Sequence, residues 1–135
     1  MTVGVLLITH EGIGNSVLEA ATRMLGGCPL RAEVLPVALE VDTEALRDLA
    51  GRRARALDDG DGVLVLTDLY GSTPSNIAAS LAGQGSVRIV AGLNLPMLVR
   101  VLNYPTDDLP GLADKAVSGG NRGILLLGAR SPDAA

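Results

Sequence analysis

The stretch VGVLLITHEGIGNS, residues 3–16, decides the fold and contains the only histidine of the chain. Residues 3–8 form an almost unbroken apolar run, which is typical of a strand buried on both faces. Thr9 and His10 follow at its carboxyl end, and residues 12–16 supply flexible backbone and helix-capping chemistry. In open α/β sheets, ligands bind beyond the carboxyl ends of the strands. The sequence therefore predicts that His10 is a reactive group.

The rest of the chain alternates short apolar runs with amphipathic stretches, which indicates βαβ units and a mostly parallel sheet. Further strands are expected over residues 32–37, 63–66, 87–91 and 123–127. Helices are expected over residues 15–25, 43–57, 73–83, 97–102 and 108–117. The prediction is a single doubly wound α/β domain, residues 1–130, with helices on both faces of a central sheet and a short flexible tail at residues 131–135.

The composition excludes several classes of protein. The net charge is −4 and two tyrosines are the only aromatic residues, which argues against a nucleic-acid-binding surface. The sequence has neither a signal-peptide pattern nor an apolar run of about 20 residues, so we expect a cytoplasmic protein without direct membrane insertion. Cys28 is the only cysteine, and we expect no disulfide, metal or cofactor. The cluster Arg52, Arg53 and Arg55 is interpreted as the solvated face of a helix.

A carboxylate is predicted beside His10. Thr67 and Asp68 follow the apolar run of residues 63–66, just as Thr9 and His10 follow the first run. If the two strands are neighbours, the Asp68 carboxylate accepts a hydrogen bond from Nδ1–H of His10 and leaves Nε2 as an unprotonated nucleophile. The same carboxylate stabilises the ring when it gains positive charge during attack on phosphorus.

The segment DLYGSTPSN, residues 68–76, supplies a candidate phosphate site. Gly71 allows close approach of the backbone, and Ser72 and Thr73 offer hydroxyl and amide groups. Thr73 is expected to cap the helix that follows, whose first N–H groups face the same space. The predicted site therefore consists of His10 and Asp68 as catalytic residues, with phosphate-binding residues Gly71, Ser72 and Thr73.

Three segments together carry a family resemblance. ITHEGIGNS with His10, DLYGSTPSN with Asp68, and GLNLPML at residues 92–98 resemble the signature segments of the enzyme IIA component of the mannose family of the bacterial phosphoenolpyruvate-dependent sugar phosphotransferase system. The resemblance extends over nearly the whole chain in matching order. It implies a phosphotransferase component with the doubly wound fold, in which Asp68 orients the histidine and Thr73 contacts the phosphate.

The resemblance also implies partners. A protein of this family accepts phosphate from the histidine phosphocarrier protein HPr on the residue that matches His10, and passes it to a IIB component. Two departures matter: Tyr70 stands where family members often carry Trp, and many members are fused to a IIB domain that this sequence lacks. The second departure leaves the downstream acceptor open. The sequence does not name the sugar, because a IIA domain contacts only proteins and a phosphoryl group.

Other phosphate-handling sites fit the residues less well. A dinucleotide site requires a glycine where Val17 stands, a receiver domain requires an acidic pair after the first strand, and a phosphohistidine phosphatase requires arginine where Thr9 stands. Two alternatives stay open. One is the related phosphotransfer subunit of dihydroxyacetone kinase, and the other is a regulatory module whose phosphorylation state is read by a partner and which moves no sugar.

The predicted strand at residues 123–127 indicates a homodimer. Residues 124–127 are apolar without alternation, so both faces of such a strand must be covered, yet little chain follows. Gly119 and Gly120 are expected to end the preceding helix and let the strand cross to a second copy, which closes a twofold dimer. The family resemblance implies the same exchange of the carboxyl-terminal strand.

Overall fold

The computed structural model describes residues 1–128, and within this range the strands form one parallel sheet in the order β2-β1-β3-β4. The strands are β1 (Gly4–His10), β2 (Ala32–Val37), β3 (Val63–Thr67) and β4 (Val87–Ala91). Every residue of β1 before His10 is buried. This follows from its central place, since helices cover the strand on both faces.

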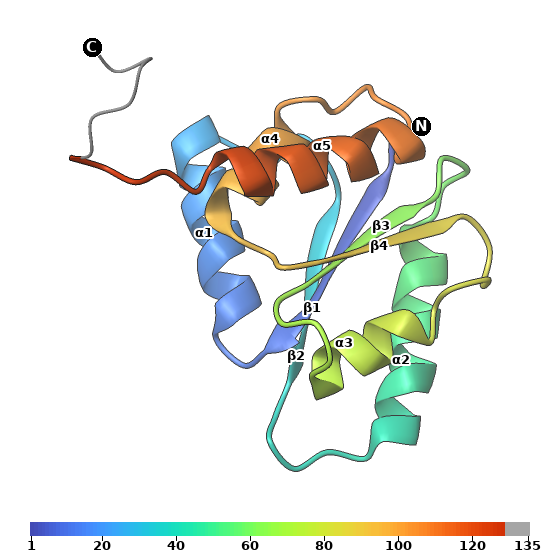
Figure 1. Cartoon of the computed structure of the whole chain (residues 1–135). Helices are drawn as coiled ribbons and strands as arrows, with labels where there is room; N and C mark the ends of the chain where they lie inside the picture. The colour runs from blue at the N-terminus through green and yellow to red at the C-terminus, as the bar shows by residue number, and fades with distance from the viewer. Residues whose placement is uncertain (129–135) are drawn as a thin grey trace.

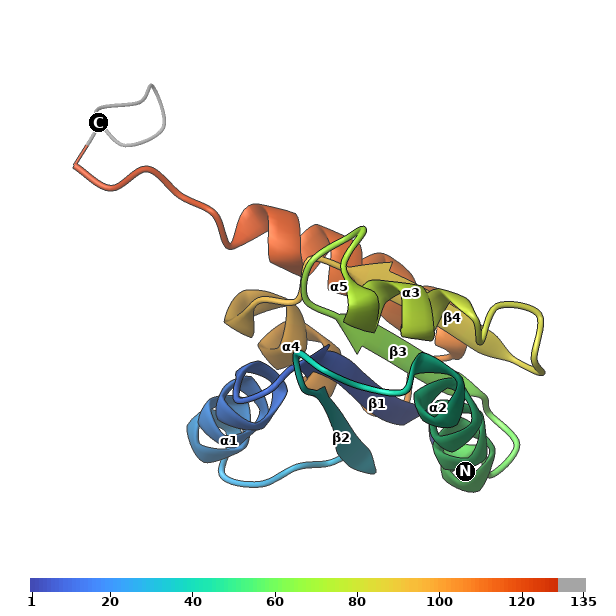
Figure 2. The ribbon, with the colours of Figure 1, turned by 90° about the horizontal axis from the view of Figure 1, so that it is seen from below.

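The helices divide between the two faces of the sheet. They are α1 (Ile13–Leu25), α2 (Thr43–Leu57), α3 (Thr73–Ala79), α4 (Leu95–Leu102) and α5 (Leu109–Arg122). Figure 1 and Figure 2 show α1 and α2 on opposite sides of the sheet. Alternate residues of β1 follow this division: Val5 and Leu7 pack in the core with α4 and α5, and Leu6 and Ile8 pack in the core with α2 and α3. The predicted doubly wound α/β class is confirmed.

Two predicted helix starts are wrong in detail. α1 begins at Ile13 rather than at residue 15, and its N-cap is Gly12, with a φ of 86° and no side-chain hydrogen bond. α3 is capped by Ser72, whose side chain accepts from the N–H of Ser75, whereas Thr73 is the first residue inside the helix. α3 also ends at Ala79, so it is shorter than the predicted helix.

The predicted strand at residues 123–127 is absent from the described part of the chain. α5 continues through Gly119 and Gly120 to Arg122, so these glycines do not end the helix as predicted. A Cβ at Gly119 would lie 2.6 Å from Cβ of Arg100, so glycine here permits close packing of α5 against α4. The chain then leaves the domain (Figure 2), with the side chains of Ile124–Leu127 exposed. The predicted tail at residues 131–135 lies outside the described residues, as does the end of the predicted 1–130 domain.

Glycines distinguish tight from tolerant positions in this fold. A Cβ at Gly4 would lie 2.8 Å from the carbonyl oxygen of Leu57 and 2.9 Å from its Cβ. We expect Gly4→Ala to lower the free energy of unfolding by about 1–3 kcal/mol, because backbone of α2 must move. Gly51→Ala in α2 is the control: its Cβ would meet only the flexible ends of Arg55 and Gln84. It should be neutral or stabilising by up to about 1 kcal/mol. Urea unfolding measures the free energy of unfolding of both variants. An equal change in the two would contradict the close packing of Gly4 against α2.

Candidate active site

His10 and Asp68 meet at the carboxyl edge of the sheet, where β1 and β3 end side by side. Oδ2 of Asp68 lies 2.8 Å from Nδ1 of His10 and accepts a second hydrogen bond from the backbone N–H of His10 at 3.0 Å. Oδ1 accepts from the N–H of Leu69 at 2.9 Å. The His10 side chain is 37% exposed and that of Asp68 only 9%. The carboxylate is thus buried behind the ring, and the ring is accessible to a partner.

The surroundings of Asp68 favour its ionised form. Burial by itself raises the pKa of the carboxyl, but the hydrogen bonds from the His10 backbone, the His10 ring and the Leu69 backbone, together with the charge of His10, outweigh it. The pKa of Asp68 therefore lies below its ordinary value of 3.8. A buried carboxylate fixed in this way holds the proton of the ring on Nδ1 and directs Nε2 outward.

The turn from β1 into α1 is held by Thr9, which is fully buried. Its hydroxyl donates to the carbonyl oxygen of His10 at 2.8 Å and accepts from the N–H of Gly14 at 2.9 Å. A Cβ at Gly14 would lie 2.8 Å from this same hydroxyl oxygen, so the contact requires glycine. The sequence places Thr9 only at the carboxyl end of the first strand. Its role in positioning the turn depends on its short distance to Gly14, which the sequence pattern does not show.

The predicted phosphate loop divides into residues that form internal hydrogen bonds and one that does not. The N–H of Gly71 donates to Oγ of Ser75 at 3.3 Å, and the Ser72 hydroxyl donates to the carbonyl oxygen of Leu69 at 2.6 Å. The N–H of Ser72 also donates to Leu69. Thr73 is exposed, and neither its N–H nor its hydroxyl has a hydrogen-bond partner in the described part of the chain. Thr73 therefore presents two donors, and Gly71 and Ser72 shape the loop.

The family comparison agrees with this geometry. The EIIA-man family model, described as "PTS system fructose IIA component", matches residues 4–115. The chain belongs to the EIIA-man family. This confirms the resemblance, carried by the three sequence segments, to IIA components of the sugar phosphotransferase system (PTS).

Individual relatives of this EIIA-man protein differ in their architecture. It is 30% identical over 133 residues to the "PTS system mannose-specific EIIAB component" of Escherichia coli K12, and the match covers 96% of this chain but 41% of that protein. The solved "mannose/sorbose specific IIA subunit" of Enterococcus faecalis has a TM-score of 0.82 and 26% identity, covering 97% and 98% of the two chains. The "transcriptional regulatory protein LevR" of Bacillus subtilis is 31% identical over 68 residues, which are 50% of this chain and 7% of that protein.

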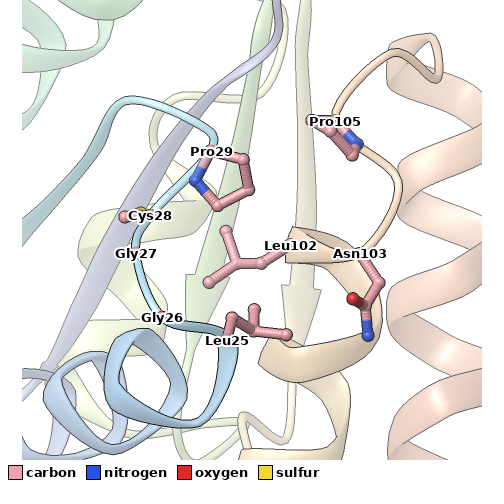
Figure 3. Close-up of a pocket in the computed structure, with 8 residues that line it drawn as sticks. All are labelled: Leu25, Gly26, Gly27, Cys28, Pro29, Leu102, Asn103 and Pro105. Atoms are coloured by element: carbon pink, nitrogen blue, oxygen red, sulfur yellow. The ribbon is translucent and has the colours of Figure 1, made fainter.

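Two other features of the EIIA-man protein take no part in the contact between His10 and Asp68. Thr67 is 1% exposed and its hydroxyl has no partner within residues 1–128, so it belongs to the packed end of β3 and not to the exposed rim. Figure 3 shows a pocket at the ends of α1 and α4, whose lining includes Leu25, Pro29, Leu102 and Pro105. The Cys28 thiol at this pocket donates to the carbonyl oxygen of Leu30.

Neither a metal site nor a membrane span is found in the described residues. No group of three or more His, Cys, Asp and Glu side chains is placed to hold a metal ion there. No helix within residues 1–128 has the length and hydrophobicity that a membrane crossing requires.

The bond between Asp68 and the ring of His10 can be measured by titration. Because the pKa of Asp68 is lower in the folded than in the unfolded chain, the ionised carboxylate stabilises the fold above pH 3.8, and this contribution is lost as the pH falls through the folded-state pKa. We expect the ¹³C carboxyl signal of Asp68 to titrate below 3.8, and to titrate at a higher pH in His10→Ala, because burial remains while the ring is lost. The carboxyl signals of other residues provide the internal control. An unchanged titration midpoint of Asp68 in His10→Ala would contradict the contact between Asp68 and the His10 ring.

Proposed function

We propose that this EIIA-man protein is a phosphoryl carrier that accepts phosphate from HPr on His10 and passes it to a IIB component. The observation that carries the proposal is the 2.8 Å contact between Nδ1 of His10 and the buried carboxylate of Asp68. This contact orients the imidazole so that Nε2 of the unprotonated ring is the nucleophile. Membership of the EIIA-man family, which is described as a PTS IIA component, supports the same function.

Each transfer exchanges one nitrogen–phosphorus bond for another. Nε2 of His10 attacks the phosphorus carried by the HPr phosphohistidine, and the bond from phosphorus to the HPr nitrogen breaks as the new bond forms. The His10 ring gains positive charge, which the Asp68 carboxylate stabilises, while the proton stays on Nδ1. The second transfer runs the same way, with the IIB component as nucleophile.

Thr73 is proposed as the residue that holds the phosphoryl oxygens during these transfers. Its N–H and hydroxyl lack internal partners among the described residues, so both can donate to an oxygen without breaking an existing bond. Gly71, with a φ of 86°, and Ser72 give the loop the shape that presents these donors. On this basis we propose that Thr73 contacts the phosphate directly, and that Gly71 and Ser72 contribute to the phosphate site by shaping the loop.

A second function is favoured by one observation. Half of this chain resembles a segment of LevR, which is described as a transcriptional regulatory protein. In a regulatory module, phosphorylated His10 would be read by a partner and would move no sugar. The chain spans 41% of the length of the mannose-specific EIIAB component. The IIB acceptor and a location in the cytoplasm are therefore part of our proposal and are not taken over from that relative.

Phosphoryl labelling tests the carrier function. Incubation with labelled phosphoenolpyruvate, enzyme I and HPr should give one acid-labile, base-stable phosphoryl group per chain, attached at Nε2 and absent from His10→Ala. Asp68→Asn should fold but transfer about 100-fold more slowly, because an amide does not stabilise the positive ring. Glu11→Gln is the matched control, since Glu11 is an exposed carboxylate next to His10 in sequence.

The outcomes separate the readings. Equal labelling of His10→Ala, or an Nδ1 adduct in ¹⁵N NMR, would overturn the site. Loss of the label on addition of a purified IIB component supports the carrier, whereas retention favours the regulatory module.

The carboxyl-terminal segment supports a dimer as part of this proposal. Ile124, Leu125, Leu126 and Leu127 are 74%, 74%, 82% and 85% exposed, which is a costly arrangement for four consecutive apolar side chains in water. β4 is paired on one side only within residues 1–128, and a cavity of about 240 Å³ lies between β4, α4 and α5. We propose that residues 122–127 of a second copy pair with this edge, and that the exchange is reciprocal.

Sedimentation tests the dimer. The intact protein should sediment as a dimer at micromolar concentration, and a chain ending at Gly123 should be a folded monomer, because it keeps α5 but lacks the apolar segment. A chain that lacks only residues 131–135 is the control and should remain dimeric. A monomeric parent protein, or a dimer formed by the chain ending at Gly123, would refute the exchange.

A further inference from the structure

A basic groove lies between α2 and α3, which pack side by side (Figure 1). On α2, Arg47, Gly51 and Arg55 follow one another at four-residue spacing and therefore share one face of the helix. They line a groove of about 550 Å³ together with Arg52 and Asp48, opposite Ser80 and Gln84, which follow α3. The groove is at the opposite end of α3 from Thr73, so it is separate from the His10 site.

The arginines of this groove carry charges that no ion pair neutralises. No carboxylate lies within salt-bridge distance of Arg47, Arg52 or Arg55 in the part of the chain that the structure describes. Arg53, on the same helix, pairs instead with Glu33 at 3.3 Å. Asp48 is the one carboxylate in the lining of the groove, so two positive charges there are uncompensated.

Gly51 forms the floor of the groove. It is buried, and a Cβ added to it would lie 3.2 Å from Nη1 of Arg55 and 3.4 Å from Oε1 of Gln84. The Arg55 guanidinium group and the Gln84 amide oxygen thus lie close to Gly51, and a side chain at this position would make the groove narrower. Glycine is unfavourable inside a helix, so helical propensity does not account for it. Nε2 of Gln84 donates to the carbonyl oxygen of Ser80 at 2.8 Å, which fixes the amide with Oε1 toward the groove.

One end of the groove is mostly apolar. Gly51, Arg55 and Gln84 also line an adjoining cavity of about 310 Å³, whose other walls include the apolar side chains of Ala54, Val63, Leu81 and Val87. Asp58 lines this cavity too, and its carboxylate accepts from the N–H groups of Gly60 and Gly62. A site of this kind joins a hydrophobic compartment to a few convergent charged groups, and its size is in the range of small-molecule pockets.

We propose that this groove binds a small organic phosphate. The phosphate lies over Gly51 between Arg47 and Arg55, where planar guanidinium groups form paired hydrogen bonds to its oxygens. The apolar part of the ligand enters the compartment beside Leu81. A phosphate monoester carries about −1.5 to −2 charges at pH 7, which matches the two uncompensated positive charges better than a single carboxylate does.

The test uses phenyl phosphate as the probe, followed by ¹H–¹⁵N NMR of the full chain. Phenyl phosphate should shift the amide signals of Gly51, Gln84 and Gly85 in a saturable way, and inorganic phosphate should bind about tenfold more weakly because it lacks the apolar part. The double variant Arg47→Gln, Arg55→Gln should bind phenyl phosphate at least about tenfold more weakly. Arg23→Gln, which changes an exposed arginine of α1, is the matched control and should bind as the parent does.

Gly51→Ala provides a second variant that keeps the charges. It should fold at least as stably as the parent but weaken binding, because its methyl group narrows the floor of the groove. Three results would overturn the proposal: no saturation by about 10 mM phenyl phosphate, an unchanged affinity in the double arginine variant, or shifts centred on Thr73 instead of Gly51. Equal affinity for inorganic phosphate would overturn the role of the apolar compartment.

Discussion

One carboxylate oxygen determines the geometry of the active site. Oδ2 of Asp68 accepts from both the ring and the backbone N–H of His10, so the imidazole is oriented with respect to its own strand as well as to β3. The arrangement exists because β1 and β3 are adjacent and in register, with Ile8 opposite Thr67 just before the two site residues. Far from this edge, the close approach of Gly4 to Leu57 packs α2 against the start of β1.

The pair of His10 and Asp68 was predictable from the sequence because two buried strands leave an unambiguous pattern. Each is a short apolar run that ends in polar residues, and parallel strands bring such ends to the same edge. The first residues of α1 and α3 were harder to predict from the sequence. Ser72 and Thr73 are adjacent hydroxyl residues that can both cap a helix, and in the fold it is Ser72 that does so. Ser75 accepts a hydrogen bond from the N–H of Gly71. The sequence gives no indication of this bond other than the four-residue spacing.

The end of the chain shows why glycine is ambiguous in a sequence. Gly119 and Gly120 were interpreted as the end of a helix, a role that glycine often has. In the structure they lie inside α5, where α4 approaches too closely for any side chain at Gly119. The two roles depend on whether another helix lies nearby, and that information resides in tertiary structure. The predicted strand after them is absent from residues 123–127 of the single chain, and its pairing with a second copy stays a proposal.

The central place of β1 also bears on how the protein meets successive partners. Like β3, β1 has a hydrogen-bonded neighbour on each side, and it is buried up to His10. Backbone amides in such a strand exchange with solvent only when much of the domain opens, whereas a surface loop such as residues 69–72 opens locally. Under the proposed carrier function, the loop can adapt to partners of different shape while the His10 ring keeps its position on a central strand.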